Sequence, residues 1–356
     1  MLSISSFMWT VIGAGPAGIA AVGQLLDKNI PPNEILWIDP DFSVGDFGSK
    51  WCKVSSNTSV KLFKRFYNHC NSFDYPSVAH HFKITQLDDS ETCLLEYAAE
   101  PLRWITDSFR QKIHTICNIV DNIELKHHYW HITFKNFSDS IPTESIRSKN
   151  IILAIGSEQK HLDYDNLSHI PLTTALDPDQ LRLNCHPNDT IAVFGSSHSA
   201  IIILQSLIEQ TNVQRIINFY QNPLRYAIYF DDWILFDDSG LKGATANWAR
   251  KYLHGEIPHQ LIRLISTPEL IKEFLPQCTK AIYSIGFNRR NIKVNGITSF
   301  NYNAHNGIIA PGLFGIGIAF PEVAVDRYGT LEYRVGMWKF MDYLNRVLPL
   351  WLRYQV

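Results

Sequence analysis

The chain has 356 residues, of which 46% are hydrophobic and 12% aromatic, a composition typical of a globular protein that is long enough for two domains. With 32 basic and 34 acidic residues and no block of like charge, nothing predicts a nucleic-acid partner. The six cysteines include no C-x-x-C pair, so we expect no bound metal. No run of 18 apolar residues predicts a membrane span, and no basic residue precedes Trp9 as it would in a signal peptide. We therefore expect a cytoplasmic protein without a membrane partner.

The first predicted element is an apolar strand that begins at Trp9 and runs directly into a glycine motif. The motif has the spacing G-x-G-x-x-G, and a helix of small residues follows. In this arrangement the first glycine permits a tight turn, the second lets the backbone approach a pyrophosphate, and the third lets helix and strand pack closely. The residues that would form this site are Gly13, Gly15, Pro16, Ala17 and Gly18.

A second predicted strand, 34–39, ends at the position where an acidic side chain binds the ribose hydroxyls of a dinucleotide. That residue is Asp39, and Pro40 follows it in an irregular stretch rich in glycine and serine. Strand, glycine motif, helix and acidic strand end together predict a dinucleotide site. The alternative is a glycine-rich turn in another kind of α/β protein.

The pattern of apolar residues in the middle of the chain predicts one helix and three strands. Apolar residues at helical spacing indicate a helix over 92–112. Strand-like runs follow at 116–121, 130–134 and 148–154. The last run leads through Ala154 to Gly156, so a hydrophobic strand ends in a glycine.

A second strand–loop–helix unit starts at residue 190. Its strand reaches residue 195, a helix is predicted over 200–208, and a further strand over 213–220 arrives at the spacing of a Rossmann fold. The loop that would hold a second pyrophosphate consists of Gly195, Ser196, Ser197, His198, Ser199 and Ala200. Ser197 stands where the middle glycine of such a motif is common, and so the alternative is a degenerate half that is kept for packing.

The choice between NADH and NADPH is made at the end of the strand 213–220. An acidic residue there favours NADH, whereas a nearby arginine favours NADPH through its 2′-phosphate. The strand end carries no acid, and Arg225 follows it, so we expect NADPH; the alternative is that Arg225 is an exposed loop charge. Residues 229–238 then alternate aromatic and acidic side chains, which predicts either a loop beside the substrate or an insertion packed on the surface.

Two apolar stretches lead to the end of the chain. The run 281–286 ends in Gly286 and repeats the pattern that ends at Gly156. The stretch 312–319 contains Gly317 and Ile318 and precedes a helix predicted over 335–347.

The predicted fold class is α/β, with two Rossmann-like dinucleotide-binding domains of which the second is inserted into the first. The expected first domain consists of 1–157 and 287–356, and the expected second domain is 158–286. Two such domains suit an enzyme that passes a hydride between two dinucleotides.

This order of motifs resembles the two-dinucleotide-binding-domain flavoproteins, which include pyridine-nucleotide disulfide oxidoreductases and flavin-containing monooxygenases, over nearly the whole chain. The resemblance implies glutathione-reductase-type domains, of which the first would bind FAD and the second NAD(P)H. It assigns the N-terminal glycine motif and Asp39 to FAD and the loop at Gly195 to NAD(P)H. It makes Ala154, Gly156 and Gly286 part of the strand ends that link the domains. Many relatives have aspartate after the last glycine, where this chain has Ile318.

Within that superfamily, the run 53–61 and the following Phe73-Asp-Tyr-Pro76 are most similar to flavin-containing monooxygenases, which carry a similar S-N-T-S sequence. The resemblance implies that Asn57 lies beside the flavin and acts in catalysis. It also implies that Lys50 and Trp51 lie against the flavin.

The function implied is that of an FAD-dependent oxidoreductase that accepts hydride from NAD(P)H and, as a monooxygenase, oxygenates a small nucleophilic substrate. One alternative is a reductase that passes electrons to an external acceptor. Another is a degenerate flavoprotein that acts as a binding or regulatory module. The expected partner is a small-molecule substrate or electron acceptor, and the chain is expected to be a monomer or a homodimer.

Overall fold

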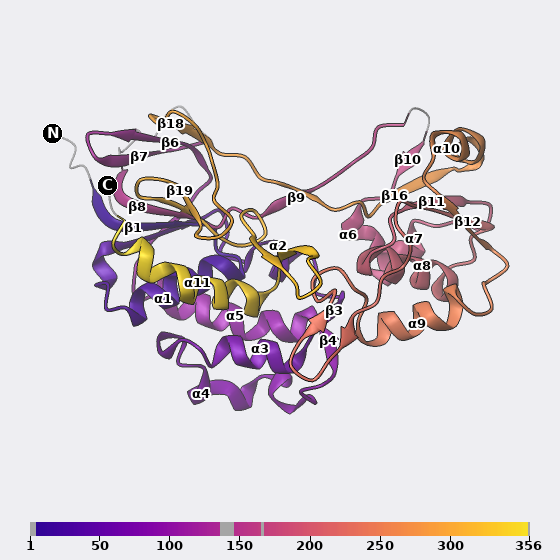
Figure 1. Cartoon of the computed structure of the whole chain (residues 1–356), viewed down its shortest axis with the longest axis horizontal. Coiled ribbons are helices and arrows are strands. Elements are labelled where there is room, and N and C mark those ends of the chain that lie inside the picture. The colour runs from indigo at the N-terminus through magenta and orange to yellow at the C-terminus, as the bar shows by residue number, and fades with distance from the viewer. Residues whose placement is uncertain (1–4, 136–145, 165–166, 355–356) are drawn as a thin grey trace. The chain divides into compact units, whose positions relative to one another are not determined.

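The chain forms two compact units in a computed structural model that describes residues 5–135, 146–164 and 167–354 (Figure 1). The first unit comprises Met1–Cys52, Ser59–Ser157 and Arg289–Val356, and the second comprises Lys53–Thr58 and Glu158–Asn288. The nucleotide-binding domains expected from the sequence, 1–157 with 287–356 and 158–286, stay a prediction, because these units are defined by packing alone. As a compact body, the second unit also includes the short segment Lys53–Thr58, which lies far from its other residues in the sequence.

A largely parallel sheet forms the centre of the first unit. Its strands are β1 (Ser6–Ile12), β2 (Ile35–Asp39), β5 (His114–Cys117), β6 (Val120–Lys126), β7 (Tyr129–Phe134), β8 (Ile146–Leu153), β18 (Lys293–Asn295), β19 (Ile308–Ala310) and β20 (Leu313–Gly315). Their order is β18-β6-β7-β8-β1-β2-β5, with β20 pairing with both β8 and β19. The pairs β1–β2, β1–β8, β2–β5 and β8–β20 are parallel. The carboxyl ends of these strands therefore meet at one edge.

Helices cover one side of this sheet (Figure 1). They are α1 (Pro16–Asp27), α3 (Val60–Tyr67), α4 (Tyr75–Val78), α5 (Leu95–Arg110) and α11 (Met337–Trp351). Residues 17–25 of α1 are all buried, because small side chains let this helix pack closely against the sheet, α5 and α11. Trp9 and Trp37 of the sheet and Phe109 of α5 share one core with α1.

The second unit is built on a sheet of five parallel strands. They are β10 (Ser168–His169), β16 (Lys280–Tyr283), β11 (Thr190–Phe194), β12 (Arg215–Tyr220) and β15 (Leu261–Ile265), in that order across the sheet. Its helices are α6 (Leu172–Ala175), α7 (Pro178–Leu183), α8 (His198–Gln210), α9 (Gly243–Leu253) and α10 (Pro268–Phe274). Every residue of β11 is buried, as expected for a central parallel strand.

The remaining elements are short. They are α2 (Gly45–Ser49), β3 (Ser55–Ser59), β4 (Thr92–Leu94), β9 (Ser157–Gln159), β13 (Ile228–Tyr229), β14 (Ile234–Leu235), β17 (Phe287–Arg289), β21 (Glu322–Val325), β22 (Leu331–Arg334) and 3₁₀ turns at Pro32–Glu34, Asn71–Phe73, Ala79–His81, Lys83–Gln86 and Leu275–Gln277. β13 pairs with β14, and β21 with β22, as antiparallel hairpins. Neither hairpin was predicted from the sequence.

The predicted fold class is confirmed: each unit contains a parallel sheet with a strand, a glycine loop and a helix in succession. The helix predicted over 200–208 already begins at His198, and the last helix runs over Met337–Trp351 rather than 335–347. None of the helices in the described ranges is long and apolar enough to cross a membrane. The same residues contain no group of His, Cys, Asp or Glu that could hold a metal ion.

Candidate functional site

The first glycine loop lies between the end of β1 and the start of α1. Gly13 has a φ of +108°, and a Cβ there would clash with the carbonyl oxygen of Ala154. A Cβ at Gly18 would clash with the carbonyl oxygen of Gly13. A Cβ at Gly15, in contrast, would meet no atom within 4 Å. Gly13 and Gly18 therefore allow the close contacts that form the turn, whereas the position of a Gly15 side chain is left unfilled.

The N-terminus of α1 offers its backbone N–H groups at this open space. Gly15 is the N-cap and Pro16 the first helical residue, and no side chain of the described residues caps the helix. The first turn also contains no acidic residue. Because the N-terminus of a helix carries partial positive charge and unpaired N–H donors, this end suits a phosphate group.

Asp39 fixes the loop from the end of β2. It is only 6% exposed, and its Oδ2 accepts a hydrogen bond from the Ala14 backbone N–H at 2.7 Å. Oδ1 accepts from Phe42 at 2.8 Å and from Asp41 at 3.1 Å. Burial raises the pKa of this carboxyl, while the backbone donors oppose the shift. A carboxylate has about four acceptor positions, so one remains for a ribose hydroxyl, the role expected for Asp39.

A small network of charges lies beside the same loop. A Cβ at Gly45, the first residue of α2, would lie 3.2 Å from Gly15 Cα, so α2 begins directly against the open glycine. Asp46 pairs with Arg290 at 2.7 Å and with Lys50 at 3.0 Å. Arg290 also donates its backbone N–H to the carbonyl oxygen of Gly156 at 3.1 Å.

The last glycine motif closes the other side of this site. Gly317 has a φ of +84°, and a Cβ there would lie 2.7 Å from the Ala17 Cβ in the first turn of α1. Ile318 is 38% exposed. The structure thus gathers the predicted residues from three distant segments at the N-terminus of α1. Pro40 and Lys50 lie on the exposed side of the turns that follow β2, and Trp51 comes directly after them.

A second loop of the same form lies between β11 and α8. Gly195 has a φ of +123°, and a Cβ there would clash with the carbonyl oxygen of Ser284. Asn218 of β12 donates to the carbonyl oxygens of Gly195 at 2.8 Å and Val193 at 3.0 Å. Ser197 is the N-cap of α8, with no side-chain cap among the described residues. Gly195 therefore makes the same close approach to a neighbouring strand end as Gly13 does in the first loop.

A cavity of about 530 Å³ adjoins this second loop. Its lining includes Gly195, Ser196 and Ser197 from the loop and Gln221, Asn222 and Ser266 from the ends of β12 and β15. Lys160 is the charged residue in this lining, which contains no carboxylate as far as the described residues go. Gly286 follows the lining residues Ser284 and Ile285 and accepts a hydrogen bond from the Lys160 N–H at 3.1 Å.

Arg225, the predicted 2′-phosphate ligand, lies elsewhere. Its guanidinium carbon is 4.5 Å from the centre of the Phe236 ring, and its NH1 donates to Ser239 Oγ at 3.4 Å. It does not belong to the described residues that line the cavity.

Asn57 and His198 contact other parts of the second unit. The Asn57 side chain donates to the carbonyl oxygen of Gly240 at 3.1 Å and accepts from the Lys242 N–H at 3.0 Å. His198 Nε2 lies 2.8 Å from the carbonyl oxygen of Ser55. Burial lowers the pKa of His198 below its ordinary value.

Comparison with known proteins identifies the family. Monooxygenase AgnR1 of Paecilomyces divaricatus is 32% identical to this chain in an alignment that covers 96% of this chain and 97% of that protein. This chain belongs to that monooxygenase family. No family model matches it.

Solved structures agree with this monooxygenase family in fold. A flavin-containing monooxygenase from Stenotrophomonas maltophilia has a TM-score of 0.66 at 12% identity, covering 99% of both chains. A bacillithiol disulfide reductase from Staphylococcus aureus has a TM-score of 0.60 at 11% identity, covering 98% of this chain and 99% of that one. At these identities the likeness establishes the fold that the sequence resemblance implied, a two-domain oxidoreductase fold.

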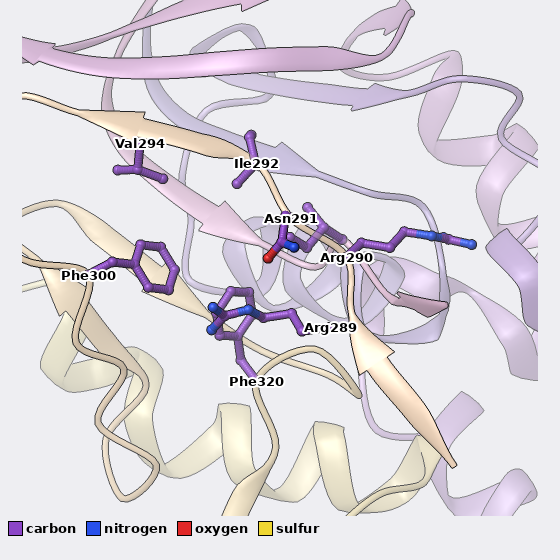
Figure 2. A pocket seen from close by; sticks show the side chains of 8 residues that line it. Arg289, Arg290, Asn291, Ile292, Val294, Phe300 and Phe320 are labelled. Atoms are coloured by element: carbon purple, nitrogen blue, oxygen red, sulfur yellow. The ribbon is translucent and has the colours of Figure 1, made fainter. Parts of the chain in front are cut away.

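In this family member, sequence reasoning missed the charges beside the first glycine loop. Arg290 is 244 residues from its partner Asp46, and no sequence motif joins them. The segment that carries Arg290 also lines a cavity of about 130 Å³ in the first unit. Figure 2 shows Arg289 beside Phe300 and Phe320, while Arg290 points away from both rings. The Arg289 guanidinium carbon lies 4.7 Å and 5.0 Å from these ring centres.

Proposed function

We propose that this chain is an FAD- and NADPH-dependent monooxygenase. The observation that carries the proposal is the pair of glycine loops, because each opens onto the uncapped N-terminus of a helix, α1 or α8. A single chain with two phosphate cradles suits an enzyme that uses two dinucleotides. Membership in a monooxygenase family supports the same conclusion.

The first unit fits FAD in shape and in donors. Because Gly15 has no Cβ and nothing lies within 4 Å of where one would be, a diphosphate would approach the backbone there, and the N–H groups in the first turn of α1 would hold it. Asp39 would accept a hydrogen bond from the ribose, and Arg290 would add positive charge beside the diphosphate. The rest of the FAD site would be lined by the backbone of three predicted residues, Gly156, Gly317 and Ile318. When bound, FAD supplies the redox centre that takes up a hydride and reacts with oxygen.

The second unit fits NADPH. The cavity beside Gly195 is about 530 Å³, within the range of cofactor sites. The N–H groups at the start of α8 would hold the diphosphate. Because the described lining contains Lys160 and no carboxylate, it attracts the additional 2′-phosphate of NADPH rather than repelling it. We therefore keep the preference for NADPH and assign the charge to Lys160 instead of Arg225.

The reaction proposed is the oxygenation of a small nucleophilic substrate. Oxygen accepts four electrons, two from NADPH and two from the substrate; one oxygen atom enters the substrate and the other leaves as water. The residues of this chain bind and orient the two nucleotides. The loop residues contain no acid that would repel the phosphates.

A reductase without oxygenase activity is the second candidate, because the site described so far contains nothing specific to oxygen. An internal dithiol relay is not part of it. None of the six cysteines forms a disulfide, and no two of them form a C-x-x-C pair. Burial raises the pKa of the Cys52 thiol, the cysteine beside α2, so it is a weak nucleophile.

Product analysis separates the two candidates. Purified enzyme with FAD and NADPH is incubated with a small nucleophilic compound, an amine or a thioether, while NADPH, oxygen and hydrogen peroxide are followed together. The proposal expects an oxygenated product with at least one compound and less peroxide in its presence. Full release of peroxide with every compound, and equally fast transfer of electrons to an added acceptor without oxygen, would support the reductase instead.

A further inference from the structure

Residues 226–242 of the second unit form an ordered hairpin, which we call the aromatic hairpin. Its base is closed by hydrogen bonds from Ala227 N to the Leu241 carbonyl oxygen at 3.1 Å and from Leu241 N to that of Arg225 at 2.9 Å. β13 and β14 pair within it. A Cβ at Gly240 would clash with the backbone of Ala227, so the two sides of the base lie in direct contact.

The tip of the aromatic hairpin presents large apolar side chains to solvent. Tyr229 is 64% and Phe230 is 43% exposed, and Phe230 stacks on Trp233 with ring centres 4.8 Å apart. Exposed aromatic side chains on an ordered element are typical of a surface that contacts a ligand. The tip thus offers exposed aromatic surface on a paired β-hairpin.

Asn57 holds the base of this hairpin with both ends of its side-chain amide. Its Nδ2 donates to the carbonyl oxygen of Gly240 at 3.1 Å, and its Oδ1 accepts from the Lys242 N–H at 3.0 Å. Lys242 in turn donates its Nζ to the backbone carbonyl oxygen of Asp237 at 2.6 Å. Both of these Asn57 hydrogen bonds thus go to the hairpin backbone.

His198 connects the segment Lys53–Thr58 to the loop 195–200, which we call the nucleotide loop. A carbonyl oxygen only accepts, so His198 Nε2 must carry the proton in its 2.8 Å contact with Ser55. The other ring nitrogen, Nδ1, is buried and has no hydrogen-bond partner in the described part of the chain. It is an unused acceptor on the first residue of α8, beside the proposed phosphate site, where it could accept from a hydroxyl or amide group of the nucleotide but not bond to a phosphate oxygen.

Lys53, at the N-terminal end of the segment Lys53–Thr58, forms ion pairs within the second unit. Lys53 Nζ lies 2.9 Å from Asp177 and 3.0 Å from Asp179, at the start of α7. Lys53–Thr58 thus contacts the nucleotide loop, the aromatic hairpin and the α7 end of its own unit. Its backbone is extended from Ser55 onward, so Ser55 and Asn57 share one short, stiff stretch.

We propose that Lys53–Thr58 is a tie between the nucleotide loop and the aromatic hairpin, and that Asn57 is a positioning residue that orders the hairpin when a nucleotide binds beside His198. This role rests on the proposed nucleotide site and goes beyond it. It also differs from the role that the family resemblance implies for Asn57, a direct contact with the flavin.

Hydrogen–deuterium exchange of the FAD-loaded enzyme, with and without NADP⁺, tests the tie. In the wild type, NADP⁺ is expected to slow exchange at residues 227 and 240–242. Asn57→Ala removes two hydrogen bonds, so exchange there rises about tenfold, and the effect of NADP⁺ disappears while NADP⁺ still binds. Asn68→Ala is the matched control, because Asn68 is an exposed asparagine of the first unit that bonds to Lys64.

Two results would overturn the tie. One is unchanged exchange of the aromatic hairpin in Asn57→Ala together with an altered flavin absorption spectrum, which would place Asn57 at the flavin. The other is NADP⁺ binding without any effect on the hairpin of the wild type. If NADP⁺ does not bind at all, the proposed nucleotide site fails instead. Asn57→Asp, which keeps the acceptor for Lys242, is the second variant and is expected to give intermediate exchange.

Discussion

Gly15 and Gly18 belong to one motif but serve different purposes. A Cβ at Gly18 clashes with backbone, whereas a Cβ at Gly15 meets nothing within 4 Å. We predict that Gly18→Ala lowers the free energy of unfolding by about 3 kcal/mol. Gly15→Val is expected to keep the melting temperature of the FAD-free protein and to weaken FAD binding about a hundredfold, or about 2.7 kcal/mol. Thermal melts and an FAD titration check both; loss of stability in Gly15→Val would contradict the account.

Arg290 and Arg289 are adjacent, and only Arg290 is paired to the first glycine loop through Asp46. Arg290→Ala removes positive charge and frees the start of α2 beside Gly15. Because the Arg290 side chain is 39% exposed, solvent screens the effect, and we expect FAD binding to weaken about five- to tenfold. Arg289→Ala, the matched control, is expected to change it less than twofold. Equal effects of both variants in an FAD titration would refute the assignment.

His198 gives the second unit a defined pH dependence. Burial, together with Lys242, lowers the pKa of His198 below 6.5, and only the hydrogen bond to Ser55 opposes this. A histidine with a lowered pKa in the folded state stabilises that state above its unfolded pKa, and the contribution is lost as pH falls through the folded pKa. Wild-type stability is therefore expected to fall more steeply below about pH 6.5 than that of His198→Asn. Parallel pH curves from denaturant unfolding would contradict this.

At the scale of elements, we propose that the end of β12 distinguishes NADPH from NADH. Gln221 is exposed and lines the cavity beside Gly195. Gln221→Asp places a carboxylate where the 2′-phosphate of NADPH would lie. We expect KM for NADPH to rise at least about tenfold, equal to about 1.4 kcal/mol, and KM for NADH to change little. Gln221→Asn is the neutral control, and an equal rise for both nucleotides would count against this position.

The elements that the sequence predicted well are those with local causes. β1, β11 and the helices after them follow from apolar runs and glycine spacing, which act over a few residues. The contacts of Asn57 were not predictable, because its partner Gly240 is 183 residues away. The aromatic hairpin was expected only as a loop, since its turn has aromatic and acidic residues instead of the usual Gly and Asn. The packing of Arg225 was not predictable for the same reason: it is near β12 in sequence, but its side chain packs on Phe236.

At the scale of the whole molecule, each of the two units contains one of the proposed nucleotide loops, before α1 or α8. The second unit occupies one continuous stretch, Glu158–Asn288, and adds only Lys53–Thr58 from elsewhere. The first unit is completed by β20 and α11 after the second has ended. A chain that only packed a degenerate second half would not need the uncapped start of α8 or the adjoining cavity.

We propose that the two glycine loops hold FAD and NADPH and that NADPH reduces the bound FAD. The most direct measurement is the visible spectrum of the FAD-loaded protein before and after NADPH is added without oxygen. The account predicts a bound-flavin spectrum that NADPH bleaches, faster than NADH does, and that is absent in Gly15→Val. A protein that stays colourless with FAD, or a bound flavin that neither nucleotide bleaches, would contradict it.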